Sequence, residues 1–427
     1  MKHTFYDVIV VGAGFAGLSA SYHLKRLGLN HVVFERGRTG ESWRSQRWDS
    51  FRLNSVNRIS QLEGHDNNIS PEEFLTTGSF VGSFEDYVSK FDLPLVENSK
   101  VISIEKPADL FEVTVSANDT VKHYLCRQVI VASGNDNEIL VPSFSKNITS
   151  NVRQLHTSEY RNAEQLPPGA ALVVGGAQSG VQIAEDLVDT GKKVYLSTSM
   201  IARVPRWYRG RDIMIWLLDM KFFDMRADDI KDPVMLKLKP PQLTGTGGSK
   251  HSISLQALAK KGVVILGKTS NAEEKNIFFQ PNAAMHIKFA DGFSMRIKEM
   301  IDGFIAQTKM VAEAAVTDEA DVPDPDASCA SSITSLSFEK DNINSIIWAT
   351  GFKNDLSYIK LPVFDEEGKL KHKEGLSPVP GLYFIGVPWL RSRKSAILYG
   401  FKEDAKFIVD KVYEYSKENS GEIPMGI

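Results

Sequence analysis

The chain of 427 residues contains little cysteine: Cys126 and Cys329 are the only two, about two hundred residues apart. This excludes a disulfide framework, a CxxC redox pair and a thiolate metal site. No apolar run reaches the ~18–20 residues that a membrane helix needs, and the N-terminus runs into a strand without a cleavable apolar segment. The net charge of -3 gives no general attraction to nucleic acid or anionic membranes. We therefore expect a cytoplasmic protein that acts on a small molecule, without metal, nucleic acid or membrane; a homodimer is left open.

Strand and helix patterns alternate along much of the chain. Near the N-terminus, the apolar run 7–11 is followed by a glycine-rich turn, a helical stretch over 16–27 and a second strand over 31–35. A similar unit begins at Ala171, with a helix through Leu187. Their nearly continuous valine and isoleucine runs are typical of buried parallel strands. Further strands are predicted at 127–134, 345–352 and 381–386, and a final helix at 395–418.

The first glycine-rich turn is a complete GxGxxG motif formed by Gly12, Gly14 and Gly17. In this motif the first glycine permits the tight turn, the second lets the backbone approach a pyrophosphate, and the third lets the helix pack against the strand. Glu35 closes the next strand, where a carboxylate can accept hydrogen bonds from a ribose diol. Because that carboxylate disfavours a 2'-phosphate, FAD or NAD fits this unit better than NADP.

The second glycine-rich turn, GGAQSG, includes Gly175, Gln178, Ser179 and Gly180, and has alanine at the middle position of the motif. No acid stands at the end of its next strand. Ser197, Thr198 and Ser199 stand there instead, and Arg203, Arg206, Arg209 and Arg211 follow. Hydroxyl and guanidinium groups can bind a 2'-phosphate, so this pattern favours NADPH, with NADH as a second donor. A solvated arginine-rich loop is the alternative interpretation.

These patterns predict an α/β protein with two Rossmann-type dinucleotide-binding domains, in which the NAD(P)H domain is inserted into the FAD domain. The predicted FAD-binding domain comprises 1–160 and 341–427. The predicted NAD(P)H-binding domain, 161–340, contains a helical insertion near 213–223. Residues 317–332 are acidic and contain proline, so we expect an exposed connection there.

The combination of motifs resembles the flavin-containing monooxygenases, class B flavoprotein monooxygenases, and in particular the bacterial branch related to the plant YUCCA-type enzymes. The resemblance rests on the two glycine motifs and on segments spread over nearly the whole chain: ASG from Ala132, ATGF from Ala349, GESWRSQRWDSFRLNS from Gly40, VPRWYRGRDI from Val204, QLTGTGG from Gln242 and WLRSRKSAILYGFKEDA from Trp389.

Two family patterns are incomplete in this chain. Of the fingerprint FxGxxxHxxxY the chain keeps His156 and Tyr160, while Ser150 and Val152 replace the phenylalanine and glycine. Where the family has Gly-Asp near the C-terminal end, this chain has Gly386-Val387. His156 and Tyr160 are four residues apart and would share one face of a helical turn, at the linker between the two domains.

The resemblance implies that NAD(P)H reduces FAD, that reduced FAD and O2 form a C4a-hydroperoxide, and that a nucleophilic nitrogen or sulfur of a small molecule takes the distal oxygen. It places Asn54 beside the flavin ring as the catalytic residue. It also implies further cofactor-binding residues: Arg36, Trp43, Arg52, Gly134, Thr350, Gly351 and Gly386.

Four other functions compete with this interpretation. A disulfide reductase needs the cysteine pair that the chain lacks. An NAD(P)H oxidase that releases H2O2 differs from a monooxygenase only in the lifetime of the peroxide. A Baeyer-Villiger monooxygenase shares both nucleotide units, but its fingerprint ends in tryptophan where this chain has Tyr160. A flavoprotein redox sensor would bind FAD without turning over NAD(P)H.

Overall fold

The computed structural model describes residues 4–135, 137–148, 151–232, 236, 239–248 and 250–419. The first of its two units is built on a seven-stranded sheet in the order β3-β2-β1-β6-β5-β4, with β19 beside β6. The strands of this sheet are β1 (Thr4–Val11), β2 (His31–Phe34), β3 (Leu95–Val96), β4 (Lys100–Glu105), β5 (Phe111–Ala117), β6 (Thr120–Val131) and β19 (Leu382–Phe384). β4 and β5 are antiparallel to their neighbours, and the other pairings are parallel.

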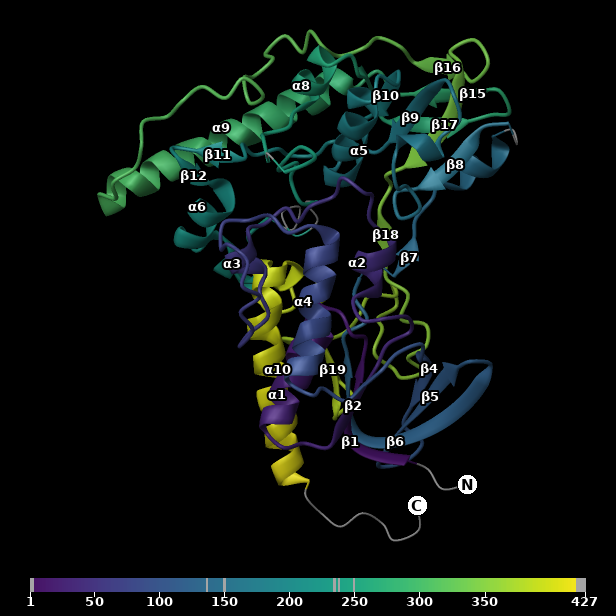
Figure 1. Cartoon of the computed structure of the whole chain (residues 1–427), viewed down its shortest axis with the longest axis vertical. Helices are drawn as coiled ribbons and strands as arrows, with labels where there is room; N and C mark the ends of the chain where they lie inside the picture. Colours follow the sequence, from purple (N-terminus) through teal and green to yellow (C-terminus); the bar gives the residue numbers. More distant parts are fainter. Residues whose placement is uncertain are drawn as a thin grey trace.

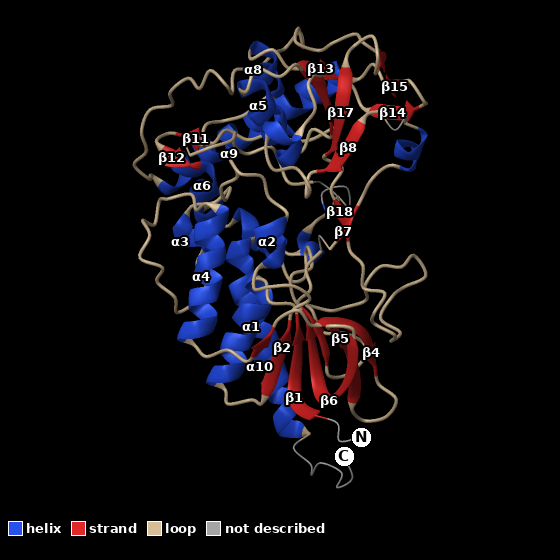
Figure 2. Ribbon diagram, turned by 45° about the vertical axis from the view of Figure 1, so that its right-hand side comes forward, coloured by secondary structure: helices blue, strands red, loops and turns tan. Residues whose placement is uncertain are grey.

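Helices α1 (Phe15–Arg26), α4 (Thr77–Lys90) and α10 (Leu398–Glu418) cover one face of this sheet, as Figure 2 shows. Their apolar residues recur at helical spacing and join Val8 and Val10 of β1 in one core. The other sheet face packs against a loop-rich segment that includes Leu356 and Val363. The carboxyl ends of the parallel strands point toward the second unit (Figure 2). In open α/β sheets ligands bind at this end of the strands.

The second unit is built on a five-stranded, entirely parallel sheet in the order β13-β10-β9-β17-β8. Its strands are β8 (Arg153–His156), β9 (Ala170–Val174), β10 (Val194–Ser197), β13 (Val264–Leu266) and β17 (Ile343–Trp348). Helices α5 (Gln178–Asp189) and α8 (Leu255–Lys260) pack against it, and a small antiparallel sheet of β14 (Thr269–Ala272), β15 (Asn276–Phe279) and β16 (Ser335–Ser337) adjoins it.

The second unit is inserted into the first, which confirms the predicted fold class. The chain passes from one unit to the other at β7 (Glu138–Ile139) and returns at β18 (Phe352–Lys353), and these two strands pair side by side between the units in Figure 1. The predicted boundary at 160 leaves β8 in the first unit, and the boundary at 340 leaves β17 there. The strand pairing instead places both strands in the sheet of the second unit. The apolar run SIIWATGF indicates a buried strand but not which sheet receives it.

The helical insertion predicted near 213–223 is present as α6 (Ile213–Asp219) and the short helix η3 (Phe222–Asp224). It packs against α9 (Ala283–Thr308), a helix of 26 residues that was not predicted. The remaining short elements are α2 (Glu41–Ser45), α3 (Asn57–Ser60), η1 (Ser143–Asn147), η2 (Ala163–Gln165), β11 (Trp207–Tyr208), β12 (Arg211–Asp212), η4 (Ala227–Asp229) and η5 (Arg393–Ala396).

The segment expected to be an exposed connection, 317–332, contains no helix or strand, but it is not wholly exposed. Asp321 is only 4% exposed and Ala327 only 5% exposed, so the segment is held down on the second unit at these points. Among the described residues, no helix has both the length and the apolar character to cross a membrane.

Candidate functional site

The first glycine turn joins β1 to α1, and each glycine has its own structural reason. Gly12 has φ +103°, and a Cβ there would lie 2.6 Å from the Ala132 carbonyl oxygen. A Cβ on Gly17 would overlap the carbonyl oxygen of Gly12, so this glycine lets α1 approach β1. Gly14 differs from both, because a Cβ there would have no neighbour within 4 Å. The chain itself does not require glycine at 14, and the open space at the start of α1 fits a dinucleotide pyrophosphate.

The Glu35 carboxylate lies beside this turn and is 8% exposed. Its two oxygens accept hydrogen bonds from the backbone N–H groups of Ala13 at 2.8 Å and Gly37 at 2.9 Å. These bonds fix the turn, and each carboxylate oxygen keeps a further lone pair that a ribose hydroxyl could use. Arg36, by contrast, is exposed, and its Nη1 lies 3.5 Å from the Asn137 carbonyl oxygen.

Two further predicted glycines lie near α1. Gly134 follows β6 with φ +77°, and a Cβ there would have no neighbour within 4 Å. Gly386 follows β19 with φ +84°, and its carbonyl oxygen accepts a hydrogen bond from the Asn135 side chain. A Cβ on Gly386 would lie 3.8 Å from Ala16. The structure therefore brings the ends of β1, β6 and β19 together around the start of α1.

The second glycine turn repeats the geometry of the first. Gly175 has φ +123°, and a Cβ there would overlap the carbonyl oxygen of Ala349 at the end of β17. A Cβ on Gly180 would overlap the carbonyl oxygen of Gly175. Ala177 occupies the N-cap of α5, as Gly14 does in α1, and like Gly14 has an extended backbone and no capping side-chain hydrogen bond. The amides at the start of α5 thus also suit a pyrophosphate.

Gln178, predicted to bind the cofactor, holds a loop against the start of α5. Its Oε1 accepts a hydrogen bond from the Leu243 N–H at 2.6 Å, and its Nε2 donates to the Thr244 carbonyl at 2.6 Å. Gln242 completes the attachment by donating to the Gly176 carbonyl, also at 2.6 Å. Ser179, the next residue of α5, remains partly exposed.

Ser197 and Thr198 do not present their hydroxyls as the 2'-phosphate prediction requires. Ser197 is 2% exposed, and its Oγ donates to the Gly267 carbonyl at 3.0 Å. Thr198 is 1% exposed, and its Oγ1 donates to the Leu266 carbonyl at 2.7 Å. The two hydroxyls join the end of β10 to the last residue of β13 and to the residue after it, because the strand pairing places those carbonyls beside them.

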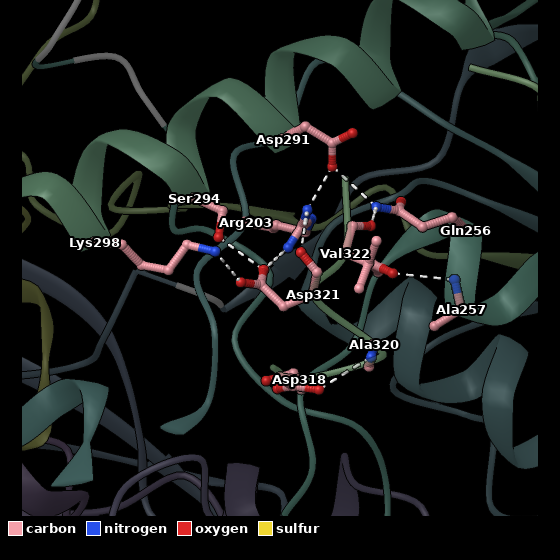
Figure 3. A network of polar contacts seen from close by, with 12 residues as sticks. Arg203, Gln256, Ala257, Asp291, Ser294, Lys298, Asp318, Ala320, Asp321 and Val322 are labelled. Atoms are coloured by element: carbon pink, nitrogen blue, oxygen red, sulfur yellow. Dashed lines mark hydrogen bonds and ion pairs between the residues drawn. The ribbon is translucent and has the colours of Figure 1, made fainter. Parts of the chain in front are cut away.

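Arg203 and Arg206 also correct the 2'-phosphate prediction. Arg203 is 1% exposed and pairs with Asp291 of α9 and with Asp321 (Figure 3). Arg206 is fully buried and pairs with Asp212. Each guanidinium already pairs with a buried aspartate, so neither is the exposed 2'-phosphate ligand that the arginine run predicts, and neither belongs to a solvated loop. Arg209 pairs with Asp302 of α9 at 2.6 Å, and Arg211 with Asp219 at 2.6 Å.

The two units meet at the segment that follows α2. The Asn54 Oδ1 accepts a hydrogen bond at 3.3 Å from Gln182 of α5, and its backbone carbonyl accepts one at 2.7 Å from Arg206. Asp186, also on α5, accepts hydrogen bonds at 2.6 Å from the hydroxyls of Ser50 and Tyr160. Asn54 is thus placed between the first unit and the nucleotide-binding helix of the second.

Arg52 and Trp43 lie on the first-unit side of this interface. The Arg52 Nη1 donates to the Phe74 carbonyl at 3.2 Å. Trp43, on α2, contacts the ring of Phe80 edge to face with a centroid distance of 4.9 Å, and Arg47 stacks on it. Both predicted residues are partly exposed and close to the same segment as Asn54.

His156 and Tyr160 do not share a helical turn, which corrects that expectation. β8 ends at His156, and a turn follows it. The His156 Nε2 lies 3.0 Å from the Gly351 carbonyl oxygen, and burial lowers the pKa of this histidine. Thr350 donates to the Leu140 carbonyl. Gly351 and Thr350 therefore fasten the strands that cross between the units. Ser150 lies outside the described residues.

Several residues of the interface were not predicted from the sequence. Gln182 and Asp186 form polar contacts across it, and Lys250 is 1% exposed beside Arg52. Gln242 supports it from within the second unit, through the Gly176 carbonyl. The spacing of Gln178, Gln182 and Asp186, four residues apart on the predicted helix, would have indicated one face. No local pattern distinguishes Lys250 or Gln242 from surface residues.

Comparisons with known proteins agree with this geometry. Residues 9–214 match the family model described as pyridine nucleotide-disulphide oxidoreductase. The chain is 28% identical over 409 residues to "Uncharacterized oxidoreductase CzcO" of Bacillus subtilis, covering 95% of this chain and 99% of that protein. It is also 28% identical to "Probable indole-3-pyruvate monooxygenase YUCCA3" of Arabidopsis thaliana, covering 96% of this chain and 87% of that protein.

Among solved structures, a flavin-containing monooxygenase from Stenotrophomonas maltophilia matches with a TM-score of 0.64 at 20% identity. This match covers 96% of the present chain and 99% of that one. At this identity the likeness shows the fold, with both dinucleotide-binding units and their order along the chain.

Proposed function

We propose that this chain, an oxidoreductase of the FAD- and NAD(P)-dependent monooxygenase family, uses NAD(P)H and O2 to oxygenate a nucleophilic nitrogen or sulfur of a small molecule. The observation that carries the proposal is the hydrogen bond between Asn54 of the first unit and Gln182 of α5. It ties the segment after α2 to the nucleotide-binding helix of the second unit, so that both cofactor sites border one interface.

The two glycine turns would hold the two cofactors. The open space at Gly14 and the N–H groups that begin α1 suit the pyrophosphate of FAD, and Glu35 keeps lone pairs for its ribose. The N–H groups that begin α5 suit the pyrophosphate of NAD(P)H. When bound, FAD supplies the oxygenating chemistry after its reduction by NAD(P)H.

Asn54 is the residue of the chain best placed to assist this chemistry. Its Oδ1 is engaged by Gln182, while among the described residues no acceptor lies within hydrogen-bond distance of its Nδ2. The N–H groups of Nδ2 are therefore available to a group bound at the interface. A donor fixed in advance in a site that excludes water stabilises developing negative charge more strongly than water does.

The cysteines do not favour dithiol chemistry. Cys126 is fully buried in β6, and burial raises the pKa of its thiol. Cys329 is partly buried in a loop of the second unit, and burial together with Asp324 raises the pKa of its thiol to about 12. Neither thiol lies in a glycine turn, so a disulfide reductase with a cysteine pair is disfavoured.

The proposal is tested by measuring NADPH consumption, H2O2 release and product mass together, over a panel of amines, thioethers and ketones. A monooxygenase transfers one oxygen atom from ¹⁸O2 to at least one compound and releases less than one H2O2 per NADPH with it. One H2O2 per NADPH with every compound would instead identify an oxidase. FAD binding with negligible NADPH turnover would identify a redox sensor, and ester formation from ketones a Baeyer-Villiger enzyme.

A further inference from the structure

Three cationic side chains converge on Phe74 at the interface between the units. The Arg206 guanidinium carbon lies 4.7 Å from the centre of the Phe74 ring, and the Lys250 ammonium nitrogen lies 5.4 Å from it. Arg52 donates to the Phe74 carbonyl, and its own carbonyl accepts a hydrogen bond from Lys250 at 3.2 Å. We call Arg52, Arg206 and Lys250 the cation cluster.

The positive charges of the cation cluster are only partly balanced by carboxylates. Asp212 pairs with Arg206, and among the described residues no carboxylate lies within ion-pair distance of Arg52 or Lys250. Arg206 is fully buried and Lys250 is 1% exposed. The Nε of Arg206 is buried and has no hydrogen-bond partner in the described chain. Burying cations without counter-charges is strongly unfavourable, and the ring of Phe74 compensates only partly.

The backbone conformation and the pKa of Lys250 also indicate an anion site. Lys250 has φ +46°, in the left-handed region that a lysine rarely adopts, and such strain concentrates at ligand sites. Burial and the nearby charges of Arg206 and Arg52 lower the pKa of Lys250 to about 7. A bound anion would oppose both effects on the pKa and favour the charged amine.

A buried apolar group adjoins the cation cluster. Val56, Ile59 and Phe74 form a small buried group, against which Met214 and Tyr399 pack. Arg52 and Asn54 are partly exposed, so the cluster reaches solvent through Arg52. A ligand that fits this place has an anionic end and an apolar body. Both glycine turns, where nucleotide phosphates are expected, are formed by other residues.

We propose that the cation cluster binds the carboxylate of the substrate, and that the substrates of this chain are amphipathic acids whose nucleophilic nitrogen or sulfur lies near Asn54. The hydrogen bond from the Arg206 guanidinium to the Asn54 backbone carbonyl at 2.7 Å links the cluster directly to the residue assigned to the chemistry. The substrate class rests on the proposed function, whereas the binding of a carboxylate does not.

The test uses FAD-loaded protein without NADPH and two probes of nearly equal shape, the anionic (benzylthio)acetate and the neutral (benzylthio)acetamide. Calorimetry should show that the carboxylate binds about tenfold or more tightly than the amide, as expected for hydrogen bonds to a charged group. Because anion binding raises the pKa of Lys250, binding at pH 7.5 should take up protons, visible as a dependence of the heat on the buffer.

The main variant is Lys250→Met, with Lys106→Met as the matched control. The pKa of Lys106 is also lowered by burial, but it donates to the Pro380 carbonyl in the first unit, away from the cluster. Lys250→Met should lose the preference for the carboxylate and the proton uptake, and Lys106→Met should keep both. The comparison of the two probes on the unmodified chain decides the question even if Lys250→Met does not fold.

Equal affinities for carboxylate and amide would overturn the proposal. So would a Lys250→Met variant that keeps the preference, or one that weakens NADP⁺ binding and leaves the probe affinity unchanged, which would assign the cluster to the nucleotide. If the carboxylate binds as expected but is never converted to its sulfoxide, the proposed function fails while the anion site stands.

Discussion

Replacing Arg203 by methionine should destabilise the protein without changing its choice of electron donor. Arg203 is 1% exposed, and the side chains of its partners Asp291 and Asp321 are 7% and 4% exposed. Removing the cation leaves two buried carboxylates, which typically costs about 3–5 kcal/mol. Asp321 keeps Lys298 and Ser294, and Asp291 keeps Gln256 and the Asp324 N–H. We therefore expect the free energy of unfolding to fall by the lower end of this range, about 3 kcal/mol.

Urea unfolding followed by circular dichroism measures this loss, and Arg209→Met is the matched control. Arg209 also pairs with an aspartate of α9, but its side chain is 27% exposed and that of Asp302 42% exposed. Ion pairs of this exposure contribute about 0.2–1 kcal/mol. The free energy of unfolding should therefore fall several times more in Arg203→Met than in Arg209→Met.

The same variant tests the assignment of the 2'-phosphate. Because Arg203 faces Asp291 and Asp321, kcat/KM should change by a similar factor with NADPH and NADH. A loss of about tenfold or more, 1.4 kcal/mol, confined to NADPH would show that the guanidinium reaches the 2'-phosphate. That outcome, or a free energy of unfolding equal to that of the unmodified chain, would refute the reasoning.

Two further predictions concern cofactor binding and coupling. Gly14→Val should fold but lose FAD, since a Cβ at 14 meets nothing within 4 Å of the chain and would enter the pyrophosphate space. The ratio of flavin to protein absorbance measures the loss, and a variant that keeps stoichiometric FAD would contradict the prediction. Gly17→Ala is the contrasting control and should impair folding itself, because its Cβ overlaps Gly12. Asn54→Ala should keep FAD and NADPH oxidation but lower product formation on the order of 100-fold, the typical effect of losing one fixed donor. Asn54→Asp should be at least as damaging, and the H2O2 released per NADPH should rise in both variants. If both variants form as much product per NADPH as the unmodified chain, only the backbone of Asn54 matters.

The sequence by itself determined the two glycine turns and the elements around them. Gly17 and Gly180 are required by contacts within one strand-turn-helix unit, which the local order of residues encodes. Gly12 and Gly175 fit the same local motif, although the carbonyls that a Cβ there would meet belong to distant residues. The predicted strands and helices next to these turns agree with β1, α1, β9 and α5 to within a few residues. Local spacing suffices to predict the turns because strand, turn and helix follow one another directly in the chain.

Only the tertiary structure decided which sheet receives β17 and what Arg203 and Arg206 bind. The apolar run of β17 would fit either sheet, and only its pairing with β8 and β9 places it in the second one. The partners of Arg203 lie 88 and 118 residues away, on a helix and a loop whose positions no local pattern fixes. A run of arginines predicts positive charge, but whether that charge meets a phosphate, a carboxylate or water depends on which distant chain segments pack against it.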